Sequence, residues 1–502
     1  MRTGAIITVV SVLFGVLWLL VHPAEPQLPN GDVFTSLGVA RHLAAGHGLL
    51  NDTVYPLFTA YEWGQTMPQP LVHRPPGLAV LLLPAWWLSG GDPVRCEALV
   101  RPVMVVVIVL MVLVGLLGLR RRGHLAASGA WLLLLLISPL MSLAVDWGWS
   151  EVPAGLMLLI LWRGIRDRRP ADLGPGRTAG FALLAAVLAM IRSDLLWVPV
   201  LWWFGALLTD PRPRWRRALA RTLLAGAIGT AAITPWYAHV TDHTGAPLAN
   251  PLIEAVQLDL SETWWEYPLL RGRTPVPLGE NLQANPVAAV HKVAVGTRVY
   301  LRTLGLWLPW LVWLAALVLW GARLRHRLRR GRALVRAIGP AGYLAITLGV
   351  MILQYGLFSH EYRHLLPLLP VLAWEGAILA DQSLRRRMRG DWRRGLLLAL
   401  LTWLCLRVTP PGLGAEYGNL STARELSARV DRVVAEHADL SPGPVFTDSA
   451  IVPWRLGRPC VWSPIDASVE AEIRAAVPAM ADAPWVRLLP GQDPLAVPPA
   501  VD

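Results

Sequence analysis

Hydrophobic residues along the chain gather in long blocks that short polar segments separate. Most blocks have roughly the 17 to 22 residues that a helix needs to cross a hydrocarbon core of ~30 Å. They predict eleven membrane-spanning helices: Ala5 to Val21, Pro102 to Leu119, Leu125 to Val145, Pro153 to Trp162, Thr178 to Ile191, Leu195 to Leu208, Leu219 to Tyr237, Val299 to Trp320, Ile338 to Phe358, Leu365 to Leu379 and Gly395 to Val408. The first block predicts an uncleaved anchor, with a signal peptide as the alternative.

One apolar segment, Pro76 to Ser89, does not fit this series. It has only about 14 residues and is interrupted by Pro84, and stretches of this length are typically re-entrant or interfacial. We therefore expect it to lie on the outer face without crossing, with Trp86 and Trp87 at the headgroup level. Phe34 to Ala44 in the same outer loop has apolar residues at helical spacing and predicts a second helix at the membrane surface.

The composition supports a membrane protein. Hydrophobic residues make up 54% and charged residues 16% of the chain, whereas about a quarter of the residues of a soluble domain are charged. The net charge of +12 comes mostly from arginines in short loops, which indicates membrane topology and not nucleic-acid binding. The arginine clusters are Arg120 to Arg122; Arg163, Arg166, Arg168 and Arg169; Arg212, Arg214, Arg216 and Arg217; Arg323 to Arg336; and Arg385 to Arg394. They follow every second span, so we predict a cytoplasmic amino terminus.

The chain changes character after residue 410. Leu420 to His437 predicts an amphipathic helix, and the segments PVFTDS, PCVWSP and WVRLLP alternate with helical stretches. We therefore expect an all-α polytopic membrane module at 1–410, with a first outer loop at 22–101, and a small outer α/β appendage at 411–502. Cys96, Cys405 and Cys460 match no disulfide framework and no metal-binding pattern.

Ionisable residues near the outer ends of the spans are the candidates for chemistry, because such residues are costly at membrane depth. They are Asp32, Arg74, Asp146, Glu151, Arg192, Asp194, His360, Glu361, Arg363 and His364. Each has a structural alternative: the acids could cap helices, and the arginines could be interfacial anchors or bind lipid headgroups. Trp147 and Trp149 could stack on a sugar or belong to an interfacial aromatic belt. The HEYRH segment lacks the HExxH spacing of a zinc site.

The order of several short motifs resembles a known family. An acid after the first span in GDVFTSLGVARHLAAGHGL is followed by RPPGLAVLLLP, SEVPAGLMLL, IRSDLLWVPVLW and YRHLLPLLPVLAW. This order over residues 1 to 400 is similar to the GT-C superfamily of membrane glycosyltransferases, in particular the bacterial protein O-mannosyltransferases and lipid A aminoarabinose transferases. Departures are Gly31 and Val33 around the first acid, Ser193 after the arginine, and His364 where a tyrosine is usual.

The resemblance implies an inverting transfer of sugar from a polyprenyl-phosphate carrier to an acceptor hydroxyl, on the outer face of a bacterial inner membrane. Asp32 matches the acid that acts as base or orients the acceptor, and Glu151 matches the acid of the second outer loop. The basic positions of the family match Arg74, Arg192 and Arg363. Candidate contacts to acceptor or sugar are Asp146, Trp147, Trp149, His73 and His364. No resident cofactor is expected, although Asp32 and Glu151 together could hold a divalent ion.

Elementary chemistry agrees with these roles. The departing lipid phosphate gains negative charge, which a planar guanidinium binds bidentately at any relevant pH. The acceptor hydroxyl is a poor nucleophile, so a carboxylate must accept its proton. Two alternatives stay open: a transporter or flippase of a polyprenyl-linked lipid, although the inverted or parallel repeats of transporters are not seen, and an inactive scaffold. The sugar and the acceptor, whether glycan, lipid or protein, do not follow from the sequence.

Overall fold

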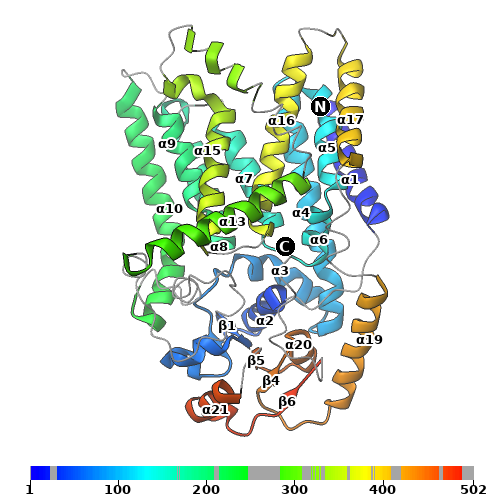
Figure 1. Cartoon of the computed structure of the whole chain (residues 1–502), viewed down its shortest axis with the longest axis vertical. Coiled ribbons are helices and arrows are strands. Elements are labelled where there is room, and N and C mark those ends of the chain that lie inside the picture. The colour runs from blue at the N-terminus through cyan, green and yellow to red at the C-terminus, as the bar shows by residue number, and fades with distance from the viewer. Residues whose placement is uncertain are drawn as a thin grey trace.

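The protein is an upright helical bundle with a smaller mixed α/β region at one end (Figure 1). The computed structural model describes residues 2–22, 31–166, 168, 170–208, 214–246, 283–307, 318, 320–322, 324–326, 328–329, 334–358, 362–385, 388, 390–408, 420–462 and 467–488. His360 and Glu361 lie outside these residues, and so does the side chain of Asp32.

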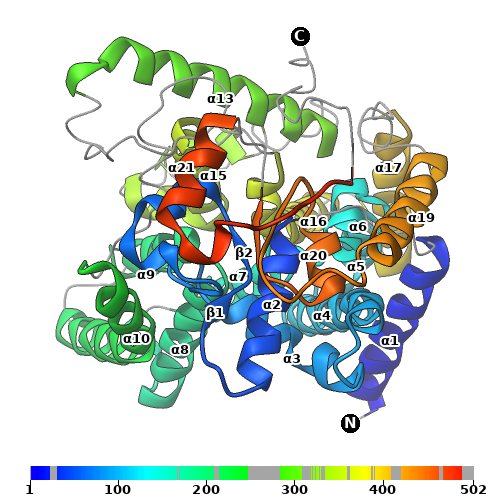
Figure 2. The same ribbon diagram turned by 90° about the horizontal axis from the view of Figure 1, so that it is seen from below.

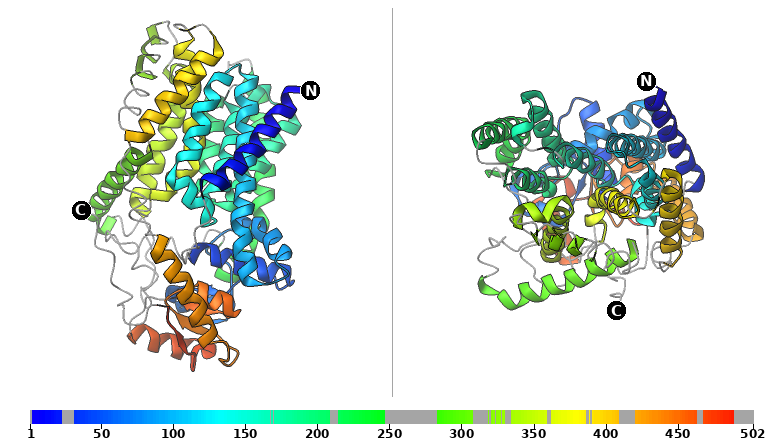
Figure 3. Two further views of the ribbon diagram at one scale, coloured as in Figure 1. Left: turned by 90° about the vertical axis from the view of Figure 1, so that its right-hand side faces the viewer. Right: turned by 90° about the horizontal axis from the view of Figure 1, so that it is seen from above.

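The bundle is built from apolar helices whose positions follow the hydrophobic blocks. They are α1 (Arg2–Val21), α4 (Pro93–Arg121), α5 (Ser128–Ile137), α6 (Pro139–Asp146), α7 (Glu151–Ile165), α8 (Pro175–Ile191), α9 (Trp197–Leu208), α10 (Trp215–Thr244), α15 (Leu334–Phe358), α16 (Leu369–Leu384) and α17 (Asp391–Val408). Helix α7 packs against α4, α8, α9 and α16, so it forms the centre of the bundle. Helix α1 lies on the outside against α4 (Figure 3).

Buried tryptophans fill the bundle, and two of them use their indole N–H groups to join helices. The indole nitrogen of Trp131 donates to the carbonyl of Pro370, and that of Trp374 donates to the carbonyl of Gly115, each at 3.1 Å. Both side chains are fully buried. These bonds join α5 and α4 to α16 across the core.

Four helices in the described part of the chain are long and apolar enough to cross a membrane. They are Gly4–Val21, Pro93–Arg121, Trp215–Thr244 and Arg363–Leu384, and a bent pair formed by α5 and α6 would make a fifth. Shorter apolar helices are Gly77–Leu88, Pro175–Ile191, Ser193–Leu208 and Gly342–Leu357. The chain is thus a multi-pass membrane protein, and the number of eleven spans stays a prediction.

Three expected spans differ from continuous α-helices. Leu125 to Val145 is divided between α5 and α6, which are bent by 62°, because Pro139 starts the second helix and the Ser138 hydroxyl caps it. The span expected from Leu365 begins within a 3₁₀ helix, η8 (Tyr362–Leu368), which contains Pro367. Helix α13 (Pro286–Trp307) starts well before Val299 and runs obliquely across the bundle (Figure 1); residues 308–317 lie outside the described part.

Two short helices lie between the bundle and the α/β region (Figure 1). They are α2 (Gly31–Ala44) and α3 (Gly77–Leu88), which pack against each other. Helix α3 is the expected Pro76 to Ser89 segment. Its 12 residues extend about 18 Å at 1.5 Å per residue, too short for a ~30 Å core.

The α/β region, called the cap here, contains the elements expected in the tail. They are α19 (Leu420–Glu436), β4 (Val445–Thr447), α20 (Ile451–Leu456), β5 (Cys460–Trp462), α21 (Ala467–Ala476) and β6 (Trp485–Val486). Figure 2 shows this region from below. Burial raises the pKa of the Cys460 thiol to about 12, so the thiol stays protonated.

The cap sheet is not made by the tail alone. Its four parallel strands have the order β2-β5-β4-β6, and β2 (Thr53–Val54) comes from the first outer loop. Thr53 is in register with Cys460, and the Cys460 N–H donates to the carbonyl of Asp52 at 2.7 Å. A second sheet pairs β1 (Leu50–Asn51) with β3 (Gln69–Pro70). The cap sheet therefore draws on both of the units expected at 1–410 and 411–502.

The charged loops divide between the two ends of the bundle. Helices α4, α7 and α16 end, and α17 begins, at the end away from the cap, and these termini carry arginine clusters (Figure 1). Among the described residues, the candidates Glu151, Arg192, Asp194 and Arg363 lie at the end that faces the cap. Under the positive-inside rule this arrangement predicts an outer cap.

Candidate functional site

Charged side chains from four parts of the bundle meet at the end that faces the cap. Glu151 is the first residue of α7, Arg192 directly follows α8, and Asp194 lies in the 3₁₀ turn η5 (Ser193–Leu195). Arg363 comes from η8, and Tyr355 from the last turns of α15. These five residues are called the arginine–carboxylate cluster below.

The local sequence explains why two of these side chains lie at helix ends. Helix α8 ends at Ile191, and Arg192 adopts an extended backbone with φ −147° and ψ 98°, so its side chain leaves the apolar face of the helix. Glu151 lies in the first turn of α7, where a carboxylate interacts favourably with the helix dipole. The N-cap position of α7 belongs to Ser150, so Glu151 follows the cap and meets the positive end of the helix dipole without capping the helix.

Arg192 is held as a planar fork between two carboxylates. Its Nε and Nη2 atoms donate to the two oxygens of Asp194, at 3.1 and 2.7 Å. Its Nη1 atom donates to Oε1 of Glu151, whose side chain is only 3% exposed. Such bidentate, charge-assisted bonds fix both the position and the plane of a guanidinium.

Aromatic residues of α13, α15 and η8 complete the cluster. The Tyr355 hydroxyl donates to Oδ2 of Asp194, and the Tyr355 and His364 rings lie 4.8 Å apart. The Tyr300 hydroxyl of α13 lies 3.4 Å from Nδ1 of His364. His364, expected to contact the acceptor or the sugar, is thus placed beside the cluster.

The second arginine of the cluster lies against an indole. The Arg363 guanidinium carbon lies 5.0 Å from the centroid of the Trp149 ring, and its Nε atom is 3.9 Å from Oε1 of Glu151. Trp147 packs edge-on against Trp149 at 5.2 Å. Arg192 and Arg363 therefore approach the same carboxylate oxygen, and their convergence on one phosphate stays a prediction.

Asp146, also considered as an acceptor contact, has a different partner. Its Oδ1 atom lies 2.7 Å from Nε of Arg101 on α4. Arg101 also donates to the carbonyl of His22 at the end of α1. Asp146 therefore belongs to an ion pair that ties α1, α4 and α6 together.

Arg74 and His73 lie in the adjoining first outer loop. The Arg74 Nη2 atom donates to the Tyr55 hydroxyl at 3.4 Å, and His73 is buried against the rings of Tyr55 and Phe58. The Tyr55 ring also lies 5.4 Å from Trp462 at the end of β5. Arg74 is thus joined to the cap.

A glycine contact brings this loop close to Arg192. A Cβ on Gly77 would overlap the carbonyl oxygen of Met190, so only glycine fits this approach of α3 to the end of α8. Arg74 precedes Gly77 by three residues, and Arg192 follows Met190 by two. The two arginines belong to the same neighbourhood, although their partners differ.

Asp32 lies in the first turn of α2, and only its backbone is described. A Cβ on Gly148 would lie 3.0 Å from Cγ2 of Val33, so this turn packs against the loop between Trp147 and Trp149. The structure therefore brings the backbone of the first-loop acid beside the loop that precedes Glu151.

Among the described side chains, no group of three His, Cys, Asp or Glu residues has the geometry of a metal site. The Asp32 side chain lies outside the described residues, so a divalent ion held by Asp32 and Glu151 stays a hypothesis. The absence of a tightly bound metal stays an expectation.

Sequence reasoning did not identify Tyr355 or Arg101. Both have their partners more than 40 residues away, and Tyr355 falls inside an apolar block, where a tyrosine attracts no notice. Lys292 on α13 was also missed: it is only 1% exposed and lies two turns before Tyr300 on the same buried face. A lysine inside a buried helix face is a signal that could have been used.

Comparisons with known proteins give structural likenesses only. No family model matches the sequence, and no curated protein matches it. ArnT from Cupriavidus metallidurans in the apo state has a TM-score of 0.54 at 13% identity, covering 91% of this chain and 85% of that chain. The same protein bound to undecaprenyl phosphate has a TM-score of 0.58 at 14% identity, covering 96% and 89%.

The Archaeoglobus fulgidus oligosaccharyltransferase, in complex with zinc and sulfate, has a TM-score of 0.56 at 12% identity. The match covers 91% of this chain but 62% of the archaeal enzyme. These likenesses extend over nearly the whole chain and confirm the fold implied by the sequence resemblance.

Proposed function

We propose that this chain, which has the GT-C glycosyltransferase fold, transfers a sugar from a polyprenyl-phosphate donor to an acceptor hydroxyl on the outer face of the membrane. The observation that carries the proposal is the pair of arginines, Arg192 and Arg363, at the Oε1 atom of Glu151. A structural neighbour, ArnT, has been solved with undecaprenyl phosphate, which supports a lipid phosphate as the carrier.

The arginines would bind the phosphate that leaves. During transfer the bond between the sugar C1 atom and the phosphate oxygen breaks, and its electron pair stays on the phosphate. Arg363 offers a guanidinium that stacks on Trp149, and Arg192 offers one whose plane is fixed by its fork with Asp194. A phosphate that reaches Arg192 competes with Glu151 for Nη1, and Asp194 holds the guanidinium plane during this exchange.

Asp32 is proposed as the base. The acceptor oxygen forms its bond to C1 on the face opposite the phosphate, and its proton passes to the Asp32 carboxylate, so the configuration at C1 is inverted. Glu151 is already engaged by Arg192, which suits it to position arginines and acceptor. Arg74, held by Tyr55 next to the cap, is proposed as a further phosphate ligand.

The test uses the purified full-length protein with a panel of radiolabelled polyprenyl-phosphate sugars, and measures the release of lipid phosphate. Asp32→Asn should lower turnover about 10²- to 10⁴-fold, the usual effect of losing a general base, while donor affinity is kept. Glu151→Gln removes the negative charge that competes with the phosphate for Nη1 of Arg192, so it should raise donor affinity while turnover falls through poorer positioning of the acceptor.

Asp172→Asn is the matched control, since this acid pairs with Arg214 in an exposed bridge. It should behave as wild type. Release of lipid phosphate that is unaffected by Asp32→Asn at saturating donor would remove Asp32 from the mechanism. Binding of the donors without release from any of them would favour a transporter or an inactive scaffold.

A further inference from the structure

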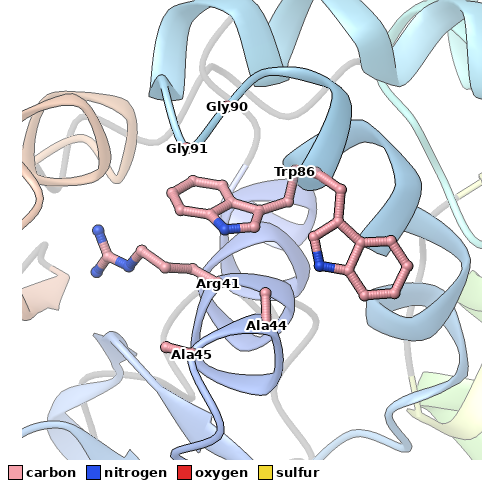
Figure 4. A pocket seen from close by; sticks show the side chains of 7 residues that line it. Arg41, Ala44, Ala45, Trp86, Gly90 and Gly91 are labelled. Carbon is pink, nitrogen blue, oxygen red and sulfur yellow. The ribbon is translucent and has the colours of Figure 1, made fainter.

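A pocket of about 290 Å³ lies between the carboxyl ends of α2 and α3 (Figure 4). Its lining comes from Arg41, Ala44, Ala45, Trp86, Trp87 and the Gly90–Gly91 turn. Gly90 and Gly91 have φ values of 66° and 83°, which reverse the chain between α3 and α4 in a conformation that glycine adopts without strain. Two alanines at the end of α2 leave the space open.

The pocket is separate from the arginine–carboxylate cluster. Helix α2 meets the cluster region with Val33 and the pocket with Ala44. Eleven residues of α-helix separate these two points by about 17 Å at 1.5 Å per residue. A ligand in the pocket is therefore distinct from a donor phosphate on Arg192.

The cation of the pocket is fixed in place. The Arg41 Nη2 atom lies 2.7 Å from Oδ2 of Asp52, and its guanidinium carbon lies 5.5 Å from the Trp454 ring centroid of the cap. In Figure 4 the Arg41 side chain and the Trp86 indole lie together below the Gly90–Gly91 turn. A guanidinium with a fixed plane binds a phosphate with little loss of side-chain entropy.

The pocket adjoins an apolar surface. Val80, Trp87 and Leu88 are 52%, 63% and 76% exposed, and their spacing of seven and one residues puts them on one side of α3. Trp87 also lines the pocket, so the pocket and the apolar side of α3 are continuous. Since the chain is a multi-pass membrane protein, lipid is the solvent that covers such a surface.

Two arginines and two acids on and beside the pocket carry no net charge between them. Arg41 is paired with Asp52, which also accepts from His42, and the exposed Asp92 and Arg95 follow the glycine turn. An anionic headgroup would leave net negative charge here, whereas a headgroup with one phosphate and one ammonium would leave none. Indole faces attract an ammonium group.

We propose that this pocket binds the headgroup of a zwitterionic membrane phospholipid of the phosphatidylethanolamine type. Arg41 binds the phosphodiester, Trp86 and Trp87 contact the ammonium group, and the acyl chains lie along the exposed side of α3. Because Arg41 also contacts Trp454, the bound lipid holds α2, α3 and the cap together at the membrane surface.

The test is native mass spectrometry of the full-length protein in detergent, titrated with phosphatidylethanolamine, phosphatidylcholine or phosphatidylglycerol. Phosphatidylethanolamine should bind at least ten-fold more tightly than phosphatidylglycerol. Ala44→Phe fills the pocket without removing a charge and should lower the affinity for phosphatidylethanolamine at least ten-fold. Arg41→Lys keeps the ion pair with Asp52 but loses the planar fork of the guanidinium. It should lower the affinity for phosphatidylethanolamine less than Ala44→Phe does.

Ala231→Phe is the matched control, because Ala231 is an exposed alanine of the membrane helix α10. Arg177→Gln removes an exposed arginine on α8 that does not line the pocket, and it should leave lipid binding unchanged. Equal or tighter binding of phosphatidylglycerol would overturn the proposal, as would equal losses in Ala44→Phe and Ala231→Phe. If Ala44→Phe does not fold, retention of tight binding by both Arg41→Lys and Trp86→Leu would also overturn it.

Discussion

Two groups of buried charges lie at opposite ends of the same bundle, and they are built differently. At the end away from the cap, Asp381 is fully buried and accepts hydrogen bonds from two arginines and a histidine. Its Oδ2 atom lies 2.7 Å from Nδ1 of His124 and 3.0 Å from Nε of Arg385, and its Oδ1 atom lies 2.8 Å from Nε of Arg394. At the other end, the arginine–carboxylate cluster centres on an arginine.

The difference lies in what is left for a ligand. Each oxygen of Asp381 is occupied by protein donors, and these bonds tie α16 to α17 and to the loop between α4 and α5. In the arginine–carboxylate cluster, Asp194 keeps 24% of its side chain exposed, and the Arg363 guanidinium lies over the Trp149 indole. We interpret Asp381, whose two oxygens both accept from the protein, as a structural connection. We interpret Arg363, which lies over an aromatic ring, as part of a site where partners can exchange.

Asp381→Ala should give the largest effect, on stability and not on chemistry. The substitution leaves Arg385, Arg394 and His124 without their shared carboxylate, and breaking a buried pair in this way costs about 3–5 kcal/mol. Thermal unfolding in detergent should shift strongly to lower temperature, while the donor affinity of the folded fraction stays near wild type. Loss of donor affinity without loss of stability would show that the two ends are not functionally different.

Arg192→Lys should give the reverse result. Lysine keeps the positive charge but cannot form the fork with Asp194, and a charge-assisted hydrogen bond is worth about 1.5–3 kcal/mol. Donor affinity should therefore fall about 10- to 100-fold, with a small change in unfolding temperature. Arg214→Lys, in an exposed bridge with Asp172, is the control. Wild-type donor affinity in Arg192→Lys would assign this arginine to anchoring.

Tyr355→Phe should give the smallest of the three effects. It removes one hydrogen bond to Asp194 and leaves the ring in place beside His364. Donor affinity should fall about ten-fold, because Asp194 orients the Arg192 plane. Tyr343→Phe on the same helix loses a bond to the carbonyl of Gly205, outside the cluster, and should leave donor affinity unchanged. Equal affinity in the two variants would remove Tyr355 from the site.

The sequence allowed the candidates to be chosen, but not their partners. Glu151 and Arg192 attract notice because charge at the end of an apolar block is unusual, and this local signal predicts their level in the membrane. Which acid meets which arginine depends on how α7 and α8 pack. Asp146 shows the difficulty: it has the same local signal as Glu151, yet it pairs with Arg101.

In the fold, too, features with a local sequence signal could be predicted, and features that depend on long-range packing could not. Hydrophobic blocks predicted the places of the bundle helices, and the short segment around Pro84 predicted the length of α3. The alternation in the tail predicted its strands, because each is marked by apolar residues between turns. The pairing of Thr53 with Cys460 had no local signal, since it joins opposite ends of the chain. The same holds for Asp381 and His124, which are 257 residues apart.

The contribution of β2 to the cap sheet has a consequence for biosynthesis. β2 leaves the ribosome early, but the strand it pairs with, β5, is made about 400 residues later. At ~5–20 residues per second, the first outer loop therefore waits roughly 20 to 80 s for its partner. Tyr55, the residue that holds Arg74, gains its contact with Trp462 only at the end of this interval. A chain that stops before the tail can insert its helices, but it leaves the edge of β2 open and the surroundings of Arg74 unfinished.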